Sequence, residues 1–423
     1  MKASLPTSHR SSIAGPKTSG SKTVEQFAHA LTLGWVRWTL GILSLASFGV
    51  AIGFRHHGLD LTVYRDGARA LSHGHLLYSD QFGATRQPHL LFTYPPFAAL
   101  LAYPFLIFPP LTAIIIWNLL TILVLMKTLQ IVLRESVKGV PELSWLLDPI
   151  ALLTLTAALV WTNPIIDHLG FGQVNVFLVF FCAVDFLAPA RFLPRGVLIG
   201  VAAAIKLVPA LFIVFFLIAR KLSVAATAAL TFALIAGFMW ILYPVPSSDF
   251  WFHALRKSSR VGGADYFSNQ AVNGLLSRAG APGGVKLVLI AAVLALGLWV
   301  AVSCWNRSER AAAFLATGIT MNLVSPISWI HHLVFLSLSV AIFFRESLLR
   351  SSAWGWAALV AYVLLVARLP YVGDAIVSSH PSGALHLLGV LLRESYVFLN
   401  LAVLLLLTRT SPTAYPAARE SRV

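Results

Sequence analysis

Charged residues are scarce in this chain of 423 residues, because Asp, Glu, Lys and Arg together make up only 11% of it. Ordinary soluble domains carry roughly 25% charged residues. Hydrophobic residues, in contrast, make up 58% of the chain. A water-soluble globular domain of this length is therefore excluded, and so is extensive disorder outside the ends of the chain.

Cysteine is almost absent, since only Cys182 and Cys304 occur, and each lies near an apolar run. Neither a disulfide framework nor a zinc site built from cysteine is expected. A P-loop and a dinucleotide-binding fingerprint are also lacking, so the sequence suggests no nucleotide or nucleotide-sugar site.

Metal-binding motifs are few as well. No Asp-x-Asp pair occurs between residues 55 and 90, and the remaining candidates are two pairs of adjacent histidines, His56-His57 and His331-His332. Adjacent histidines more often point apart than together. We therefore predict neither a metal ion nor a cofactor.

Basic residues outnumber acidic ones and give a net charge of +15. In a soluble chain this excess would suggest a nucleic-acid partner. Here the Lys and Arg residues lie mostly at the ends of apolar segments, as cytoplasmic anchors of membrane helices do, and no basic stripe with interleaved aromatics is present. We expect a membrane lipid environment and no nucleic-acid partner.

The order of apolar and polar segments predicts an all-α integral membrane protein. Residues 1–33 are rich in Ser, Thr, Lys and Gly and are expected to form a disordered cytoplasmic tail. The first long apolar run, 35–54, has no cleavage site after it and is expected to remain as a helix. Further apolar stretches lie at 91–108, 111–133, 149–161, 173–189, 196–219, 222–243, 285–305, 311–325, 333–344, 353–367 and 385–408. They predict about ten to twelve spans. Several are shorter than the roughly 20 residues that a bilayer requires, which indicates half-helices, re-entrant segments or boundaries that lie elsewhere.

The distribution of Lys and Arg in the short loops predicts which loops face the cytoplasm. The tail 409–423 is expected on the cytoplasmic side. Residues 34–408 are expected to form the transmembrane catalytic domain. The loops expected on the outer face are about 55–90, 162–172, 244–284, 325–332 and 368–384. The loop 244–284 breaks the trend, because it carries four basic residues, Arg256, Lys257, Arg260 and Arg278. We interpret these as candidates to bind an anionic ligand.

Histidine and aspartate gather on the outer side. Ten of the 13 histidines and seven aspartates lie in or beside the outward loops. Ionisable residues concentrated at one face of an apolar body predict a site that opens to the outside and receives lipid-linked ligands.

Asp60 is the most informative acidic residue. Asp60, Tyr64 and Ala68 recur at helical spacing, which predicts a short amphipathic helix along the membrane surface. Partial dehydration there would raise the pKa of the Asp60 carboxyl toward the range of a general base. The alternative interpretation of Asp60 is a helix cap or a solvated loop charge.

Asp66 follows six residues later and falls on another face of the same predicted helix. It is flanked by Arg65 and Arg69. We interpret Asp66 as one half of a structural ion pair.

Five separated motifs resemble glycosyltransferase family 87, a family of integral-membrane GT-C enzymes. They are DLxVYRxGARAL continuing to FTYPPFAALLAYP at 60–104, HLGFGQVN at 168–175, AAIKLVPALF at 203–212, SNQAVNGLLSR at 268–278 and SPISWIHH at 325–332. Their order matches the family over most of 55–345, whereas the chain beyond about 350 shows little resemblance.

The resemblance implies a polytopic GT-C bundle that uses a polyprenyl-phosphate-linked sugar donor. The family's catalytic carboxylate opens the DLxVY motif, which is Asp60 here, and its histidine pair corresponds to His331 and His332. The resemblance implies a catalytic role for one of this pair, either in proton transfer or in holding the departing phosphate. The alternative is that the two histidines line a polar pocket or anchor the interface. By likeness to mycobacterial members, the implied reaction is inverting transfer of mannose to the 2-hydroxyl of a mannosylated glycolipid of phosphatidylinositol mannoside or lipomannan type. The implied place is the outer face of a bacterial plasma membrane. Arabinosyltransferases also occur in the family, so an arabinose donor remains an alternative.

Residues that could contact substrate lie in the same motifs and in the basic loop. A lysine inside an apolar run, Lys206, is either a phosphate ligand or an interface anchor whose amine reaches toward the cytoplasmic surface, with a slight preference for the anchor. Loop 244–284 is favoured as the donor side, because amides and guanidinium groups suit phosphate and sugar hydroxyls. The full set of substrate-binding candidates is Tyr64, Arg65, Tyr94, Gln173, Asn175, Lys206, Arg256, Lys257, Arg260, Asn269, Gln270, Arg278 and Trp329.

Two other classes of protein compete with the enzyme. A transporter or lipid flippase would favour inverted repeats and ionisable residues near the bilayer midplane, and neither is visible in the sequence. A non-catalytic membrane scaffold would leave the grouped outward Asp, His and Arg residues without a reason.

Overall fold

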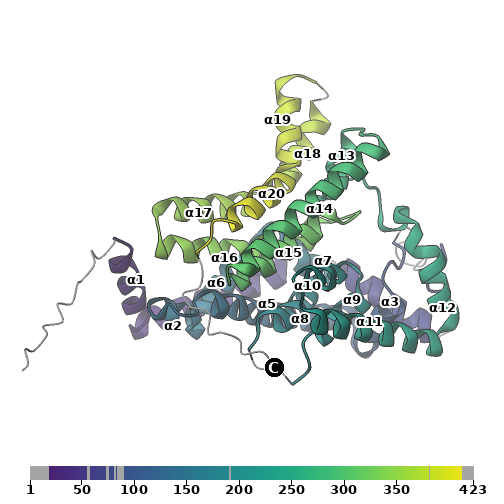
Figure 1. The fold of residues 1–423 in the computed structure, drawn as a ribbon, viewed down its shortest axis with the longest axis horizontal. Helices are drawn as coiled ribbons and strands as arrows, with labels where there is room; N and C mark the ends of the chain where they lie inside the picture. Colours follow the sequence, from purple (N-terminus) through teal and green to yellow (C-terminus); the bar gives the residue numbers. More distant parts are fainter. Residues whose placement is uncertain are drawn as a thin grey trace, which may run out of the picture.

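The computed structural model describes residues 19–54, 58–72, 76–80, 82, 90–189, 192–380 and 382–411, and helices dominate all of the longer stretches (Figure 1). No strand forms in these residues apart from an isolated antiparallel bridge between Asn269 and Trp329. The predicted all-α class is therefore confirmed.

The helices follow one another with short connections. Those of the first half are α1 (Ser19–Ala30), α2 (Gly34–Phe54), α3 (Leu59–Ser72), α4 (Pro96–Leu101), η1 (Tyr103–Leu106), α5 (Pro110–Ser136), η2 (Pro141–Leu147), α6 (Pro149–Val160), α7 (Asn163–Phe171), α8 (Asn175–Leu187), α9 (Val197–Ile205), η3 (Val208–Ala210) and α10 (Leu211–Ile218). Those of the second half are α11 (Leu222–Leu242), α12 (Pro244–Ser248), η4 (Asp249–His253), η5 (Ala254–Arg256), η6 (Ser258–Val261), α13 (Val272–Arg278), α14 (Gly283–Asn306), α15 (Arg310–Val324), η7 (Ile330–His332), α16 (Val334–Leu349), α17 (Ser352–Val366), α18 (Leu369–Ser379), α19 (Gly383–Arg393) and α20 (Ser395–Leu407).

Four single helices, α2, α5, α11 and α14, are long and apolar enough to cross a membrane. Four further pairs qualify together but bend by 51° to 117° at a short break: η2 with α6, α7 with α8, α17 with α18 and α19 with α20. By length and composition, the described part of the chain holds up to eight spans, fewer than the ten to twelve expected. The difference arises because α15 and the run Val208–Ile218 are apolar but shorter. The bent pairs fit the expected half-helices or re-entrant segments, and which of the two they form stays a prediction.

An aromatic cluster fills the centre of the bundle where α8, α10, α14 and α15 meet. The ring of Phe186 lies 5.1 Å from that of Phe215 and 5.4 Å from that of Trp305, measured between centroids. Gly318 lets α15 approach α16, because a Cβ atom at this position would lie 2.2 Å from the ring of Phe335. Close packing of this kind fixes the positions of the breaks on either side of it.

Helix α1 corrects the expectation that residues 1–33 are disordered. Val24 is buried, and the ring of Phe27 stacks on Trp145 of η2 with centroids 5.7 Å apart. Val24 and Phe27 are three residues apart and so share one face of a helix, which makes the segment amphipathic and stabilises it by burial against η2. Residues 1–18 of the predicted tail lie outside the described residues, as do residues 412–423.

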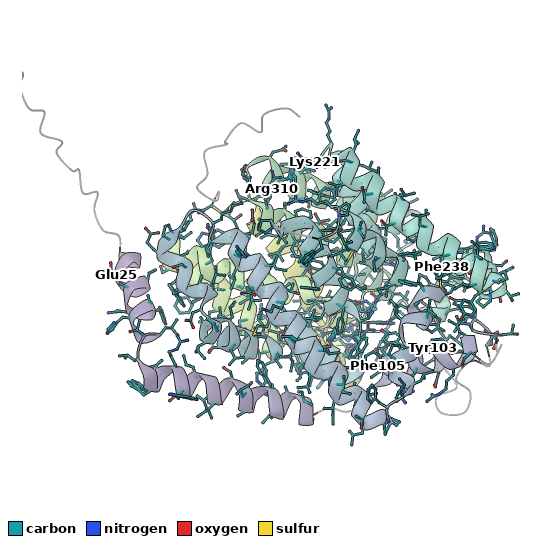
Figure 2. All side chains as sticks on the ribbon, turned by 90° about the horizontal axis from the view of Figure 1, so that it is seen from below. Glu25, Tyr103, Phe105, Lys221, Phe238 and Arg310 are labelled. Carbon is teal, nitrogen blue, oxygen red and sulfur yellow. The ribbon has the colours of Figure 1, made fainter. Side chains whose placement is uncertain are left out.

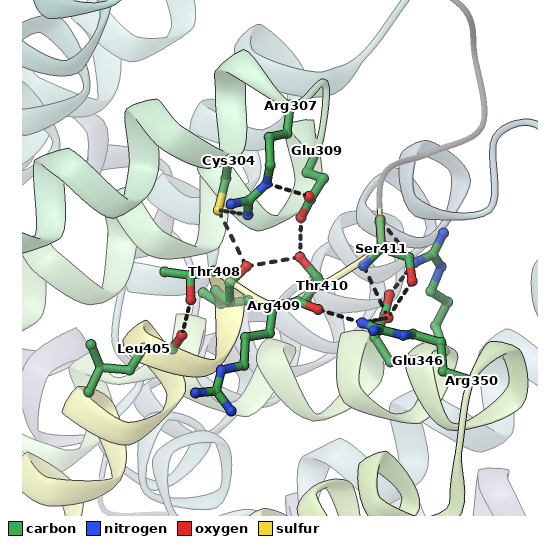
Figure 3. A network of polar contacts seen from close by, with 12 residues as sticks. Cys304, Arg307, Glu309, Glu346, Arg350, Leu405, Thr408, Arg409, Thr410 and Ser411 are labelled. Atoms are coloured by element: carbon green, nitrogen blue, oxygen red, sulfur yellow. Dashed lines mark hydrogen bonds and ion pairs between the residues drawn. The ribbon is translucent and has the colours of Figure 1, made fainter.

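A polar network holds the end of α20 against the ends of α14 and α16 (Figure 3). Arg307 and Thr410 both donate hydrogen bonds to the carboxylate of Glu309. The backbone N–H and the hydroxyl of Ser411 donate to Glu346 at 3.1 and 3.0 Å. These contacts stabilise the last described residues at a single end of the bundle.

Two basic and two aromatic side chains mark different edges of the molecule. Figure 2 places Lys221 and Arg310 toward one edge, and Tyr103 and Phe105 toward another. Lys221 precedes α11, whereas Tyr103 and Phe105 lie in η1, close to the start of α5.

Candidate active site

The predicted amphipathic helix at Asp60 is confirmed as α3, and its start is fixed to α7. The backbone N–H of Gly58 donates a hydrogen bond of 2.9 Å to the carbonyl oxygen of Gly170. Gly58 has a φ of +53°, a left-handed conformation that favours glycine. Asp60 therefore lies in the first helical turn, and Tyr64 follows one turn later on the same face.

The break between α7 and α8 brings two amides to the same place. Gly172 ends α7 with a φ of +68°, and a Cβ atom there would lie 2.8 Å from the Cβ atom of Leu61. The chain turns by 117° at this break. Gln173 and Asn175, which follow the turn, are both buried within the bundle.

Gln173 connects the two tyrosines of the site. The hydroxyl of Tyr64 donates to Oε1 of Gln173 at 3.0 Å, and Nε2 of Gln173 lies 3.2 Å from the hydroxyl of Tyr94. The two tyrosine hydroxyls are themselves 3.1 Å apart. The side chain of Gln173 also forms a hydrogen bond with the Asp60 carboxylate. Residues from α3, the segment before α4 and the α7–α8 break thus form one hydrogen-bonded group.

Lys206 joins this group from the break between α9 and η3. Helix α9 ends at Ile205, because Pro209 has no N–H to donate to the carbonyl of Ile205. The Lys206 amine donates to Oδ1 of Asn175 at 2.9 Å and lies 5.3 Å from the centroid of the Tyr94 ring. The preferred interpretation of Lys206 as an interface anchor is therefore wrong, since its amine is directed into the bundle.

The histidine pair completes the polar cluster. His331 Nε2 lies 3.4 Å from Nε2 of Gln173, and His332 Nε2 lies 3.2 Å from the Lys206 amine. Burial, and next the positive charge of Lys206, hold the pKa of both histidines well below the usual value. Both imidazoles are therefore neutral. An amide N–H and an ammonium group donate to the two Nε2 atoms, which assigns the ring protons to Nδ1.

The Asp60 carboxylate has the electrostatic environment of a general base. Burial raises its pKa from 3.8 to about 6, against the opposing effects of the Lys206 charge and the hydrogen bond from Gln173. A carboxylate with this pKa is ionised at neutral pH and accepts a proton more readily than an ordinary aspartate. We call Asp60, Tyr64, Tyr94, Gln173, Asn175, Lys206, His331 and His332 the polar cluster.

A pocket with about 420 Å³ of space not filled by atoms, part of it open to the outside, adjoins the polar cluster. Asn175, Lys206 and His332 belong to both. The remaining lining residues are mostly apolar: Leu178, Val179, Cys182, Val208, Pro209, Phe212, Met321, Asn322, Ser325, Ser328 and Phe335. Cationic and amide groups next to apolar walls suit a ligand with an anionic head and an apolar chain.

The pocket also contains a polar residue that the sequence analysis missed. Asn322 is 3% exposed, and its Nδ2 atom has no hydrogen-bond partner among the described residues. A single amide within the apolar run 311–325 was the available signal. Its N–H group is suited to donate to an oxygen of a bound ligand.

The motif 268–278 occupies a structural position. Asn269 accepts a hydrogen bond from the Ser328 N–H and donates to the carbonyl of Ala264, and Gln270 donates to the carbonyls of Phe267 and Arg393. These contacts fix the segment that carries the histidine pair to the outer loop. They do not bring the two amides to the polar cluster.

Arg278 also lies outside the polar cluster. Its guanidinium group forms a two-pronged ion pair with Glu394, and both side chains are 5% exposed. Its remaining N–H groups donate to the carbonyls of Tyr266 and Asn269. A guanidinium neutralised in this way has no free edge for a phosphate group, so the structure gives the donor-side prediction for Arg278 no support.

The other predicted residues lie outside the polar cluster. Arg65 donates to the carbonyl of Phe108. Arg256 and Lys257 are exposed, and Trp329 packs edge-on against Tyr266 at 5.8 Å between centroids. The predicted ion pair of Asp66 with Arg69 is confirmed, with Oδ1 and Nη1 2.5 Å apart.

Metal ligands do not converge in the described residues, where no group of three or more His, Cys, Asp or Glu side chains is placed to bind an ion. The rings of His331 and His332 are inclined by 79° to one another. The pair His56-His57 lies outside the described residues. The expectation of a metal-free site stays a prediction.

Apolar helices that bend around a buried polar cluster define an integral membrane protein with an enclosed polar site. The sequence pattern of glycosyltransferase family 87 matches residues 92–326. The chain therefore belongs to glycosyltransferase family 87, and the predicted family is confirmed.

Several curated relatives are similar over most of their length. The polyprenol-phosphate-mannose-dependent alpha-(1-2)-phosphatidylinositol mannoside mannosyltransferase of Mycobacterium tuberculosis is 30% identical over 328 residues, or 74% of this chain and 73% of that protein. The polyprenol-phosphate-mannose-dependent alpha-(1-2)-phosphatidylinositol pentamannoside mannosyltransferase of Mycolicibacterium smegmatis is 32% identical over 367 residues, or 81% and 83%. No solved structure shows a significant match.

Proposed function

We propose that this protein transfers mannose from polyprenyl-phosphate-mannose to a hydroxyl of a mannosylated glycolipid. The main observation in support is that Asp60 and Lys206 interact electrostatically within one polar cluster, beside a pocket with apolar walls. The names of the relatives support the donor and a phosphatidylinositol mannoside acceptor. Transfer to the 2-hydroxyl, and action on lipomannan-type acceptors, follow from the same likeness.

The chemistry of the reaction requires one base and one cation. Asp60 takes the proton of the acceptor hydroxyl as its oxygen attacks the anomeric carbon, and the bond from that carbon to the phosphate oxygen breaks. The departing polyprenyl phosphate gains a negative charge, which the ammonium group of Lys206 stabilises. A phosphate leaves without acid assistance, so a second carboxylate is unnecessary, in contrast to glycoside hydrolysis. A single displacement inverts the anomeric centre, and a β-linked donor gives an α-linked product.

The neutral histidines have positioning roles in this scheme. His332 accepts a hydrogen bond from the Lys206 amine and so directs it toward the pocket. His331 holds the Gln173 amide, which also contacts Asp60. Proton transfer by either histidine would need a charged imidazole, which burial disfavours.

We further propose that residues 34–408 form the catalytic domain and that the polar cluster faces the outside of a bacterial plasma membrane. The distribution of Lys and Arg in the loops supports this orientation. The network around Glu309 and Glu346 lies at the end of α20, in a different part of the chain from helix α3, which carries Asp60.

The direct test uses purified protein in lipid nanodiscs with radiolabelled polyprenyl-phosphate-mannose and a phosphatidylinositol mannoside. We expect a radiolabelled glycolipid that survives the mild acid that cleaves the donor and that α-mannosidase digests. Transfer from polyprenyl-phosphate-arabinose instead would establish the alternative donor. Asp60→Asn should abolish transfer, whereas Asp66→Asn, on the same helix and paired with Arg69, is the matched control and should retain it. Absence of transfer from both donors would contradict the proposed function.

A further inference from the structure

Arg260 carries a buried guanidinium group whose hydrogen bonds are incomplete. Its side chain is 8% exposed and lies in η6, within the outer loop that follows α11. Nη1 lies 3.2 Å from Oδ1 of Asp80. Nε and Nη2 have no hydrogen-bond partner among the residues that the structure describes. Buried donors without partners are costly, which points to a missing ligand at this edge.

The unpartnered atoms form the side of the guanidinium group that binds two oxygens at once. Nε and Nη2 carry parallel N–H bonds, and a phosphate group accepts such a pair through two of its oxygens. Among the described residues, the acidic partner of Arg260 is Asp80, which contacts the other end of the guanidinium group and has a side chain that is 91% exposed. An anion can therefore bind Arg260 while Asp80 turns into solvent.

Arg260 is separate from the cation that serves the reaction. Lys206 contacts Asn175 and His332, whereas Arg260 contacts Asp80 and acts electrostatically on Tyr78. The two regions are connected through aromatic residues, because the hydroxyl of Tyr78 donates to the backbone carbonyl of Tyr94 at 2.6 Å. Tyr78 thus neighbours both Arg260 and the segment that carries Tyr94 of the polar cluster.

The surroundings of Arg260 have the composition of a membrane surface. Phe252, Leu255 and Val261 are large apolar side chains exposed in the same loop, and Arg256 and Lys257 are exposed cations between them. Exposed apolar residues interleaved with cations are typical of segments that lie among lipid headgroups. Lipid headgroups carry phosphodiesters, so a segment of this composition would meet the phosphodiester of an acceptor lipid.

We propose that Arg260 binds the anionic phosphodiester of the acceptor glycolipid and exchanges Asp80 for it. The inference rests on the proposed function, since it assigns the donor phosphate to Lys206 and the acceptor phosphate to Arg260. It replaces the expectation that the loop 244–284 contacts the donor. The acceptor is then selected by its charge as well as by its sugar.

The test compares an anionic acceptor with a neutral one that carries the same sugar. The probes are a phosphatidylinositol mannoside and an octyl α-mannoside. For Arg260→Ala we expect a rise of roughly tenfold or more in KM for the anionic acceptor, as for loss of a charge-assisted pair. KM for the neutral acceptor and for the donor should stay unchanged. Arg69→Ala, which also removes an arginine paired with aspartate on the outer side, is the control and should alter none of these values.

Asp80→Asn provides a second measurement if Arg260→Ala fails to fold. Removing the competing carboxylate should lower KM for the anionic acceptor and leave the neutral acceptor unaffected. A higher KM for the donor in Arg260→Ala would assign Arg260 to the donor and overturn the proposal. Equal effects on both acceptors, or no effect of either variant, would also overturn it. If the wild-type protein transfers mannose to neither acceptor, the proposed function itself fails.

Discussion

The amine of Lys206 lies 3.2 Å from Nε2 of His332, in a cluster that also contains the Asp60 carboxylate. A neutral imidazole that accepts from an ammonium group fixes its direction without removing its charge. The positive charge therefore remains available to a departing phosphate while its position is set by the fold.

Replacing Lys206 should affect the chemical step more than donor binding. We expect Lys206→Ala to lower kcat by about 10²- to 10³-fold, the usual effect of removing a group that stabilises developing charge. Steady-state kinetics with polyprenyl-phosphate-mannose measures this value. A change in KM alone, with kcat preserved, would show that Lys206 binds the donor equally in the ground and transition states.

The pH dependence should reflect the raised pKa of Asp60. The carboxylate must be unprotonated to act as a base, so its contribution is present above its pKa and is lost as the pH falls through it. Burial lowers the pKa of Lys206 to about 8, so the ammonium group loses its charge, and activity should fall, as the pH rises through that value. With a pKa of about 6, kcat/KM should fall below pH 6, by about tenfold per pH unit. An ordinary aspartate, in contrast, would remain active down to about pH 4. A profile that stays flat to pH 4.5 would remove Asp60 from the role of base.

Gln173 should control the pKa of Asp60 without taking part in the reaction. Its hydrogen bond to Asp60 lowers that pKa, in opposition to burial. Gln173→Leu roughly keeps the volume of the side chain but removes its hydrogen bond to Asp60. The acidic limb of the pH–activity profile should therefore move to higher pH. A reduced rate with an unmoved limb would indicate that Gln173 only supports packing. Gln130→Leu, an amide that contacts Lys127 on α5, is the control and should not shift the limb.

Local spacing in the sequence was sufficient to predict part of the site. Asp60 and Tyr64 share a face because helical residues four apart always do, and the half-helices follow from the lengths of the apolar runs. The direction of Lys206 was not predictable, because it depends on where α9 ends relative to Asn175 and His332. Hydropathy alone gives no information on such contacts between distant segments.

The structural role of Arg278 could not be predicted from the sequence for a similar reason. Arg278 is a basic residue in a loop expected on the outer face, where few basic residues are expected. It was therefore interpreted as a candidate to bind an anionic ligand. Its partner Glu394 is 116 residues away in the sequence, in a region with no recognised motif. An ion pair between residues so far apart in the sequence is visible only in the folded structure. Composition and motifs therefore favoured an external anion for Arg278, whereas its partner in the structure is the carboxylate of Glu394.

The ion pair of Arg278 with Glu394 should contribute to stability and not to donor binding. Both side chains are 5% exposed, so Arg278→Met removes the two-pronged partner of a buried carboxylate and leaves Glu394 with only the Nε of Arg393 at 3.2 Å. The cost should therefore stay below the about 3–5 kcal/mol of a buried charge that loses its only partner. We expect a lower melting temperature for the detergent-purified variant, and an unchanged KM for the donor in the fraction that remains folded. The double variant Arg278→Met/Glu394→Leu replaces the buried ion pair by an apolar pair of similar volume and should recover part of the lost stability, since it leaves only the more exposed Arg393 without its carboxylate partner. If the single variant instead keeps its melting temperature and raises KM for the donor, Arg278 binds substrate as its charge first suggested.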